Sequence, residues 1–320
     1  MVVSEDNVKA DHTNVVVAGA TGTIGRAVVL ECAARGFDVN ALVRSESSAD
    51  LPELAGAQLF EVDLAAPDEV ASAMNAAKPD TVISCIASRS GSPKDARAVD
   101  LEANLHLLLG AQGVGAEHFI LLSAICVQRP KLAFQHAKLA FEKALIEAPI
   151  AHTIVRPTAF FKSLSGQVDR VAQGKPFFLF GNGELTACKP ISDADLARFI
   201  VDQVGDPEAR GAILPIGGPG PAITLKRQGE ILFEAAGLEP KFRSVPVGLF
   251  SLFAGVFSMG AWASDWMAEK AEYARIARYY ATQSMLLLDP ETAEYSAEAT
   301  PEFGSERLID HYKALLNKGG

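Results

Sequence analysis

A glycine-rich turn between an apolar strand and a helix constrains this chain most. Residues 15–25 read Val-Val-Val-Ala-Gly-Ala-Thr-Gly-Thr-Ile-Gly, and an apolar helix pattern follows them. We expect Gly19 to allow the tight turn, Gly22 to let a pyrophosphate approach the backbone, and Gly25 to let the helix pack on the strand. The turn therefore predicts a dinucleotide site. Its expected lining residues are Gly19, Thr21, Gly22, Ile24 and Gly25.

Two arginines indicate which dinucleotide would bind. Arg44 follows the expected second strand, residues 37–43, where an NAD enzyme usually carries an acidic residue for the ribose 2′-hydroxyl. Arg26 lies in the glycine loop. Guanidinium groups bind a 2′-phosphate bidentately, whereas a carboxylate would repel it. We therefore predict NADPH rather than NADH. The alternatives are a glycine turn without a ligand and two solvated surface arginines.

The composition narrows the function classes further. Of the 320 residues, 49% are hydrophobic and 21% are charged, and the net charge is -10. This charge disfavours a nucleic-acid partner, because phosphate backbones are bound through basic surfaces. The four cysteines are scattered, without a Cys-x-x-Cys pair or clustering with histidine. We therefore expect buried thiols in a reducing compartment and no metal site.

Strands and helices alternate over the first half of the chain. After the first strand, we expect strands at residues 37–43, 57–62, 81–87, 118–123 and 150–156, with helices that include residues 95–112 and 129–147. Alternation over about 150 residues implies a right-handed, doubly wound parallel sheet, an α/β Rossmann fold. We assign residues 14–157 to this NADPH-binding domain. The carboxyl ends of its strands would bring Asp63 and Ser84 to the cofactor.

The alternation loosens after Thr158, where Gly- and Pro-rich segments separate short strands and loops. We expect residues 191–216 to return to the sheet through a helix at 193–204 and a strand at 212–216. Thr224 is the expected N-cap of a later helix. Residues 158–190 and 217–320 would then form a smaller C-terminal substrate-binding lobe.

One segment of the lobe is unusually apolar. Residues 244–264 contain no charge across 21 positions. This length would permit a membrane span. Pro246, three glycines and four serines argue against one. We expect a helix that lines an apolar pocket or touches a membrane surface, with a buried core helix as the alternative.

The residues after the fifth expected strand carry a broken catalytic signature. Ser123 ends this strand, and the next helix reads Phe134-Gln-His-Ala-Lys138. The pattern, with the Gly-x-x-Gly-x-x-Gly turn, resembles the short-chain dehydrogenase/reductase superfamily, in which Ser is followed by Tyr-x-x-x-Lys. There the tyrosine protonates a carbonyl oxygen. With Phe134 in its place, either the chain binds NADPH without catalysis or its substrate has no carbonyl oxygen to protonate.

Several further motifs are too unusual for a generic nucleotide-binding sheet. They include Leu121-Leu-Ser-Ala-Ile-Cys-Val127, Ile154-Val-Arg-Pro-Thr-Ala-Phe-Phe-Lys-Ser163 and Leu286-Leu-Leu-Asp-Pro-Glu-Thr292. From residue 14 to residue 303 the chain closely resembles the divinyl (proto)chlorophyllide 8-vinyl reductase family. The resemblance implies NADPH-dependent reduction of the C8 vinyl group of a magnesium tetrapyrrole to ethyl, in chlorophyll and bacteriochlorophyll biosynthesis. The conjugated macrocycle would accept the negative charge, so no tyrosine is required.

The resemblance also implies roles for the residues of the signature. Lys138 would hold the nicotinamide ribose and supply a positive field. Ser123 would orient the nicotinamide amide or a water molecule. His136 is a candidate proton relay, with a solvent-facing helix histidine as the alternative.

A flat tetrapyrrole needs a broad apolar slot and a cation for its propionate. We expect Phe160 and Phe161 to stack on the substrate beside Phe134. Lys162 or Lys189 would pair with the propionate. Core phenylalanines and solvated lysines are the alternatives.

Residues 1–13 show neither a secretion signal nor a transit peptide pattern. We therefore expect a bacterial cytoplasmic protein, with peripheral contact to a photosynthetic membrane left open. Two rivals to the reductase remain. One is a non-catalytic NADPH-binding sensor or assembly protein, and the other reduces a different conjugated alkene, as isoflavone reductase relatives do. The oligomeric state, the proton donor and the axial ligand of the magnesium are not determined by the sequence.

Overall fold

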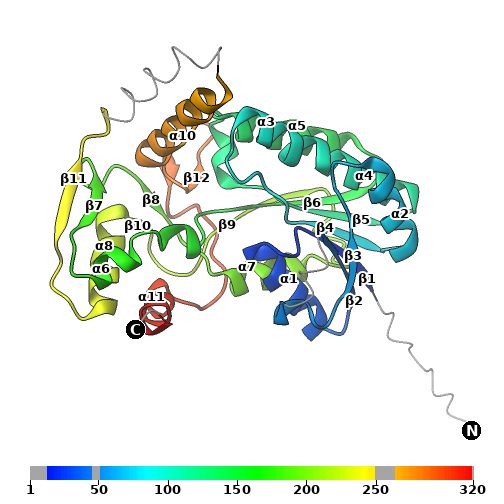
Figure 1. The fold of residues 1–320 in the computed structure, drawn as a ribbon, viewed down its shortest axis with the longest axis horizontal. Coiled ribbons are helices and arrows are strands. Elements are labelled where there is room, and N and C mark those ends of the chain that lie inside the picture. Colours follow the sequence, from blue (N-terminus) through cyan, green and yellow to red (C-terminus); the bar gives the residue numbers. More distant parts are fainter. Residues whose placement is uncertain (1–12, 45–50, 249–263, 319–320) are drawn as a thin grey trace, which may run out of the picture.

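The alternating strands assemble into one parallel sheet. The computed structural model describes residues 13–44, 51–248 and 264–318, and its central sheet has the order β3-β2-β1-β4-β5-β6-β9 (Figure 1). Every neighbouring pair in this sheet is parallel. The strands are β1 (Asn14–Ala18), β2 (Asp38–Val43), β3 (Gln58–Glu61), β4 (Thr81–Ser84), β5 (His118–Leu122), β6 (Ala151–Pro157) and β9 (Ala212–Ile216). The predicted doubly wound α/β fold is confirmed, and its strand order reverses between β1 and β4.

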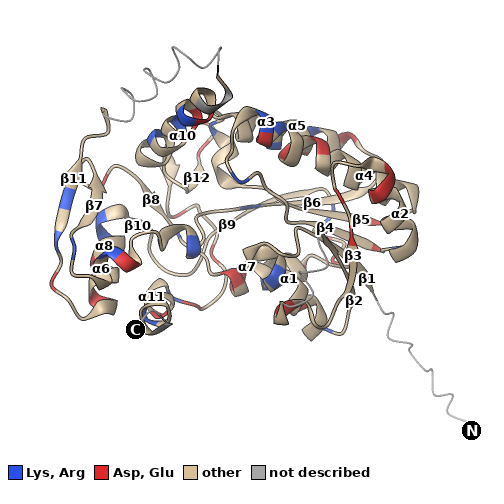
Figure 2. Ribbon diagram, viewed as in Figure 1, with Lys and Arg blue, Asp and Glu red and all other residues tan. Residues whose placement is uncertain are grey.

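Helices cover both faces of the sheet. On one face α1 (Thr23–Ala34) packs against α7 (Asp193–Asp202). The other face carries α2 (Pro67–Ala77), α4 (Asn104–Gly113) and α5 (Ala133–Glu147). Val15 and Val17 belong to the first core and Val16 to the second, so β1 is buried on both sides. This double burial explains why the strand reads as a continuous apolar run. Figure 2 shows the strands of the sheet largely free of charged residues.

Three expected boundaries were wrong. β4 ends at Ser84 rather than at residue 87. The helix expected at 95–112 has three parts, namely α3 (Pro93–Ala96), a π-helical turn η3 (Arg97–Ala103) and α4. A 3₁₀ turn, η4 (Ile125–Gln128), precedes α5, which begins at Ala133 rather than at residue 129. Pro130 explains this late start, because a residue before proline avoids helical angles and Arg129 has φ −128°.

A smaller lobe follows the sheet in the chain and lies on the left of Figure 1. Its core includes Val171, Phe177, Phe233 and Tyr312, all fully buried. The Thr224 hydroxyl accepts a 3.2 Å hydrogen bond from Arg227 N, which confirms the predicted N-cap. The lobe contains the strand pairs β7 (Phe177–Phe180) with β11 (Phe242–Val245), β8 (Ala187–Cys188) with β10 (Ile223–Thr224) and β12 (Leu287–Leu288) with β13 (Tyr295–Ser296), and the helices α6 (Val168–Ala172), α8 (Leu225–Ala236), α10 (Asp265–Thr282) and α11 (Leu308–Lys318).

Most of the apolar segment 244–264 lies outside the described residues. Its first residues, Ser244 and Val245, end β11. Within the described ranges, no helix is long and apolar enough to cross a membrane.

The last part of the chain returns to the nucleotide-binding fold. Glu302 forms a parallel bridge with Gly217, just after β9. The carboxylate of Asp195 in α7 is fully buried and accepts hydrogen bonds from Ser305 N at 3.1 Å and Glu306 N at 2.9 Å. This segment therefore joins α7 and the edge of the sheet to the lobe.

His118, the first residue of β5, should make folding stability depend on pH. Its side chain is 2% exposed, and its Nε2 lies 2.9 Å from Thr153 Oγ1. Burial, helped by the charge of Arg210, lowers the pKa of His118 to about 4. In the unfolded chain the pKa of this histidine is about 6.5. Between about pH 6.5 and about pH 4 the unfolded state therefore binds a proton that the folded state does not bind. Stability is full above about pH 6.5 and falls by roughly 3 kcal/mol as the pH drops towards about 4.

Urea denaturation midpoints between about pH 7.5 and about pH 4.5 would measure this loss. His118→Gln should flatten the profile relative to the wild type, whereas the exposed His136→Gln should leave it unchanged. A His118→Gln profile as steep as that of the wild type would assign the loss to other groups.

Candidate cofactor and substrate site

The glycine turn is tightly packed where α1 meets β1 and is exposed at Gly22. Gly19 has φ +78°, and its oxygen accepts a 2.9 Å hydrogen bond from Gly22 N. A Cβ at Gly25 would lie 2.1 Å from Gly19 O, so only glycine lets α1 start this close to β1. Gly22 is exposed and is the N-cap of α1, where it leaves the first N–H groups of the helix free of a side-chain cap. Half-buried Thr21 and buried Ile24 flank it. This cradle fits a pyrophosphate.

The two arginines expected near the adenosine ribose lie at the edge of this cradle. Arg44 is exposed and directly follows β2. Arg26 Nη1 lies 3.6 Å from Glu53 Oε1, and its buried Nε has no hydrogen-bond partner among the described residues. Asp63 is exposed after β3, and its Oδ1 accepts a 2.9 Å hydrogen bond from Ala65 N. Asp63 thus stabilises the turn that precedes α2.

Ser84 lies deeper than expected. Its side chain is fully buried, and its hydroxyl donates a 2.6 Å hydrogen bond to Asn104 Oδ1 in α4. Because β4 ends at this residue, the hydroxyl points into the contact between sheet and helix. The Ser84 hydroxyl is therefore engaged within the core, and its contact with the cofactor stays a prediction.

Lys138 is held by a partner that the sequence analysis missed. Its Nζ lies 2.9 Å from Asp100 Oδ1, and the two residues are 9% and 1% exposed. Ser88 N also donates to Asp100, at 3.4 Å. Asp100 lies in the π-helical turn η3. A carboxylate between Val99 and Leu101 in an apolar helix pattern was the available signal.

Ser123 is engaged by a second unexpected acid. Its hydroxyl donates a 2.5 Å hydrogen bond to Glu142 Oε1 of α5. Arg156 in β6 forms a salt bridge with the same carboxylate. Ser123 and Glu142 are 4% and 2% exposed. Glu142 follows Lys138 by one helical turn, which places both on one side of α5.

Phe134 and His136 lie on different sides of α5. Phe134 is half-buried and packs in a cluster with Ile276 and Tyr279 of α10. His136 is exposed, which agrees with its alternative as a solvent-facing helix residue. The structure therefore does not bring His136 to Lys138 and Ser123.

The segment after β6 separates the two candidate stacking residues. Phe161 is 2% exposed and belongs to the core of the lobe, which agrees with its alternative as a core phenylalanine. Phe160 is half-buried and packs against the core under α1 and α7. Lys162 is exposed, and its Nζ donates a 2.6 Å hydrogen bond to Thr23 Oγ1 at the start of α1. This cation therefore lies beside the glycine turn.

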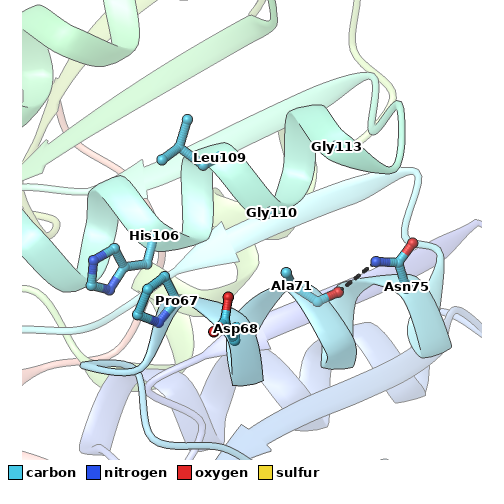
Figure 3. A pocket seen from close by; sticks show the side chains of 8 residues that line it. All are labelled: Pro67, Asp68, Ala71, Asn75, His106, Leu109, Gly110 and Gly113. Atoms are coloured by element: carbon cyan, nitrogen blue, oxygen red, sulfur yellow. Dashed lines mark hydrogen bonds between the residues drawn. The ribbon is translucent and has the colours of Figure 1, made fainter.

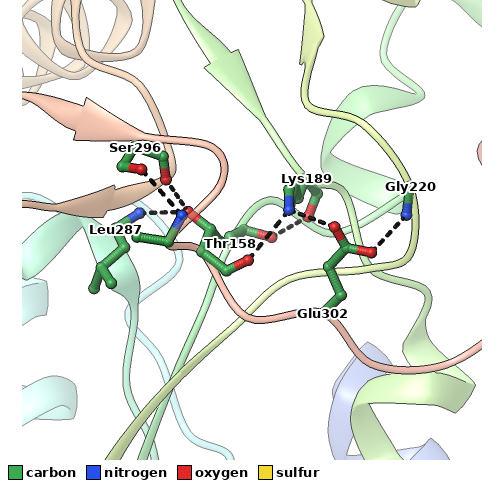
Figure 4. Close-up of polar contacts among 8 residues, drawn as sticks. Thr158, Lys189, Gly220, Leu287, Ser296 and Glu302 are labelled. Carbon is green, nitrogen blue, oxygen red and sulfur yellow. Dashed lines mark hydrogen bonds and ion pairs between the residues drawn. The ribbon is translucent and has the colours of Figure 1, made fainter.

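Lys189 is the second candidate for the propionate, and the structure places it among internal partners. The residue is 5% exposed. Its Nζ forms a salt bridge with Glu302 and donates a 3.2 Å hydrogen bond to Thr300 O (Figure 4). Glu302 also accepts from Gly220 N at 3.1 Å, and these contacts lower the pKa of its carboxyl. The ammonium of Lys189 is thus used to join segments of the lobe.

A separate hollow lies between α2 and α4 on the outside of the sheet (Figure 3). It has a volume of ≈ 260 Å³ and contains none of the predicted site residues. Its lining residues are Pro67, Asp68, Ala71, Asn75, His106, Leu109, Gly110 and Gly113. Across the described ranges, no group of His, Cys, Asp and Glu is arranged to hold a metal ion.

The chain is similar in sequence to known nucleotide-binding proteins. Residues 19–207 match a family model described as NAD(P)H-binding. A divinyl chlorophyllide a 8-vinyl-reductase of Cucumis sativus is 46% identical over 96% of this chain and 77% of its own length. A photosystem II assembly factor, Ycf39 of Trieres chinensis, is 25% identical over 82% of this chain and 81% of its own.

Among solved structures, the NADPH-dependent quinone oxidoreductase QOR2 of Escherichia coli, in complex with NADPH, has a similar fold. It superimposes with a TM-score of 0.68 at 16% identity, over 95% of this chain and 100% of its own. The nucleotide-binding fold and its glycine cradle agree with the family model. The alignment with the 8-vinyl-reductase covers 96% of this chain, so it extends into the lobe. The chain belongs to the divinyl chlorophyllide a 8-vinyl-reductase family of NAD(P)H-binding proteins.

Proposed function

We propose that the protein reduces the C8 vinyl group of a divinyl chlorophyllide-type magnesium tetrapyrrole to ethyl, with NADPH as the reductant. The observation that carries the proposal is the identity of 46% to an 8-vinyl-reductase over 96% of the chain, lobe included. Conservation of a cofactor fold alone would not extend into the lobe that follows it.

The residues of the site suit reduction of an alkene. NADPH supplies a hydride when it is bound. The glycine cradle would hold the pyrophosphate, and Lys138 would hold the nicotinamide ribose. Phe134 offers no hydroxyl to protonate a carbonyl oxygen. A conjugated macrocycle needs no such acid at an oxygen, because it spreads the negative charge itself. Phe160 and exposed Lys162 remain candidates for the ring and its propionate.

The preference for NADPH over NADH is part of the proposal, and Arg44 should determine it. Arg44→Ala removes an exposed guanidinium at the end of β2. We expect the Kd for NADPH to rise about tenfold, since a charge-assisted hydrogen bond contributes ~1.5 kcal/mol or more. The Kd for NADH should stay unchanged.

Fluorescence titration with both dinucleotides measures this selectivity. Arg243→Ala, an exposed arginine of β11 in the lobe, is the matched control. Equal losses for the two dinucleotides would contradict a contact between Arg44 and the 2′-phosphate.

Purified protein with NADPH and 3,8-divinyl chlorophyllide a tests the reaction. We expect a blue shift of the Soret band and a mass gain of two hydrogen atoms in the pigment. Unchanged pigment despite tight NADPH binding would contradict the proposal. Oxidation of NADPH with only another conjugated alkene would identify a reductase of a different substrate.

A non-catalytic NADPH-binding assembly protein is the second candidate. It is favoured by the similarity to Ycf39 and by the replacement of the usual tyrosine by Phe134. The lower identity, 25% against 46%, weighs against it. The pigment experiment separates the two, because an assembly protein would bind NADPH without consuming it.

A further inference from the structure

A buried ion pair determines where the proton of Ser123 points. The carboxylate of Glu142 is 2% exposed and faces the guanidinium of Arg156, whose Nε donates to Oε1 at 3.2 Å and whose Nη2 donates to Oε2. A carboxylate paired with a guanidinium in this way is ionised and can only accept hydrogen bonds. The hydroxyl of Ser123 must therefore be the donor in its 2.5 Å contact with Glu142 Oε1.

This contact uses the only proton of the hydroxyl. A serine Oγ has one proton and two lone pairs. In the described part of the chain, no recorded hydrogen bond ends on Ser123 Oγ. Ser123 N donates to Val155 O at 2.8 Å, which fixes the residue at the end of β5. The Ser123 oxygen can therefore still accept a hydrogen bond but has no further proton to donate. It suits a ligand group that carries an N–H or O–H.

Ser123 also lies where such a ligand would bind. It directly follows β5, at the carboxyl edge of the parallel sheet. Ligands of open α/β sheets bind at this edge. Phe134, Lys138 and Glu142 recur at four-residue spacing along α5, so they lie on adjoining turns of the helix, and Glu142 contacts Ser123.

We propose that Ser123 Oγ accepts a hydrogen bond from the carboxamide N–H of the bound nicotinamide, and that Glu142 is a positioning residue that enforces this direction. A carboxamide offers an oxygen on one side and an amino group on the other, and the lone pairs of Ser123 select the amino side. A carbonyl substrate at the same place would meet lone pairs instead of a donor. The inference rests on the proposed function in that the cofactor is a nicotinamide dinucleotide.

Binding of two oxidised cofactors tests the proposal without any turnover. The 3-acetylpyridine analogue of NADP⁺ carries a methyl group in place of the carboxamide amino group. In the wild type we expect calorimetry to show a preference for NADP⁺ over this analogue. Ser123→Ala should reduce that preference about three- to tenfold, the value of one neutral hydrogen bond. Ser123→Ala leaves the pair between Glu142 and Arg156 in place.

Two further variants complete the test. Ser72→Ala, an exposed serine of α2, is the matched control and should keep the wild-type preference. The double variant Glu142→Gln with Arg156→Met introduces an amide that can donate to Ser123 Oγ without facing the guanidinium, so the hydroxyl would turn its proton towards the ligand. The preference for NADP⁺ should then fall as in Ser123→Ala.

An unchanged preference in Ser123→Ala overturns the contact with the carboxamide, and an unchanged preference in the double variant overturns the role of Glu142. If either occurs while the wild type still reduces divinyl pigment, the inference fails and the proposed function stands. If the wild type binds neither dinucleotide, the proposed function fails together with the inference.

Discussion

Replacing Lys138 with methionine is expected to lower the turnover number for divinyl pigment at saturating NADPH by at least about a hundredfold. Methionine keeps much of the side-chain length and removes the charge. Lys138 is 9% exposed, so water would not replace the positive field that its ammonium would supply at the nicotinamide. Steady-state kinetics with varied pigment at fixed, saturating NADPH measures the loss.

Stability has to be separated from catalysis in this variant. Lys138→Met alone leaves the carboxylate of Asp100 buried and without its 2.9 Å partner, which costs about 3 kcal/mol or more. The double variant with Asp100→Asn removes both charges and should recover much of the stability but none of the turnover. Lys143→Met on the exposed side of α5 is the control and should behave as the wild type. Normal turnover in the double variant would remove Lys138 from the mechanism.

A second large effect is expected for Gly25→Ala, which should raise the Kd for NADPH at least about a hundredfold and lower the free energy of unfolding by about 3 kcal/mol. The added Cβ would lie 2.1 Å from Gly19 O and 2.7 Å from Gly19 C. Both are backbone atoms of the turn, so α1 must move away from β1 and the cradle must open.

Cofactor titration and urea denaturation would measure both parts of this effect. Gly113→Ala in α4 is the matched control, because a Cβ there meets no atom within 4 Å. It should change neither quantity by more than about 0.5 kcal/mol. A Gly25→Ala protein with wild-type affinity would show that the turn tolerates a side chain and that its packing does not shape the site.

The sheet could be predicted from the sequence because its signals are local. Strands such as β1 are apolar on both faces, and Gly19 and Gly25 mark the turn that follows. The end of β4 and the start of α5 could not be placed as well. The first depends on Ser84 joining a helix contact, and the second depends on how Pro130 restricts Arg129.

Sequence patterns did not identify the acidic partners of Lys138 and Ser123. Lys138 and Ser123 were found from their motif. Their acidic partners were not: Asp100 comes from another element, and Glu142 lies on α5 but outside the motif. Asp100 lies in a π-helical turn, so a period of 3.6 residues gives its orientation incorrectly.

The sequence also could not tell which of two residues of the same type would be buried in the core. Phe160 packs under α1, whereas Phe161 enters the core of the lobe. Lys162 is exposed, but Lys189 is buried against Glu302, which lies 113 residues further along the chain. Which lysine remains solvated depends on such long-range pairs, and composition does not encode them.

The contact between Asp195 and the returning C-terminal segment also bears on the order in which contacts form during translation. Asp195 accepts from Ser305 N, which is translated 110 residues later. Until that residue leaves the exit tunnel, the carboxylate lacks its two backbone donors, Ser305 N and Glu306 N, and has Arg198, in the same helix, as its partner. The full set of hydrogen bonds to this carboxylate therefore forms only after the C-terminal segment has been translated.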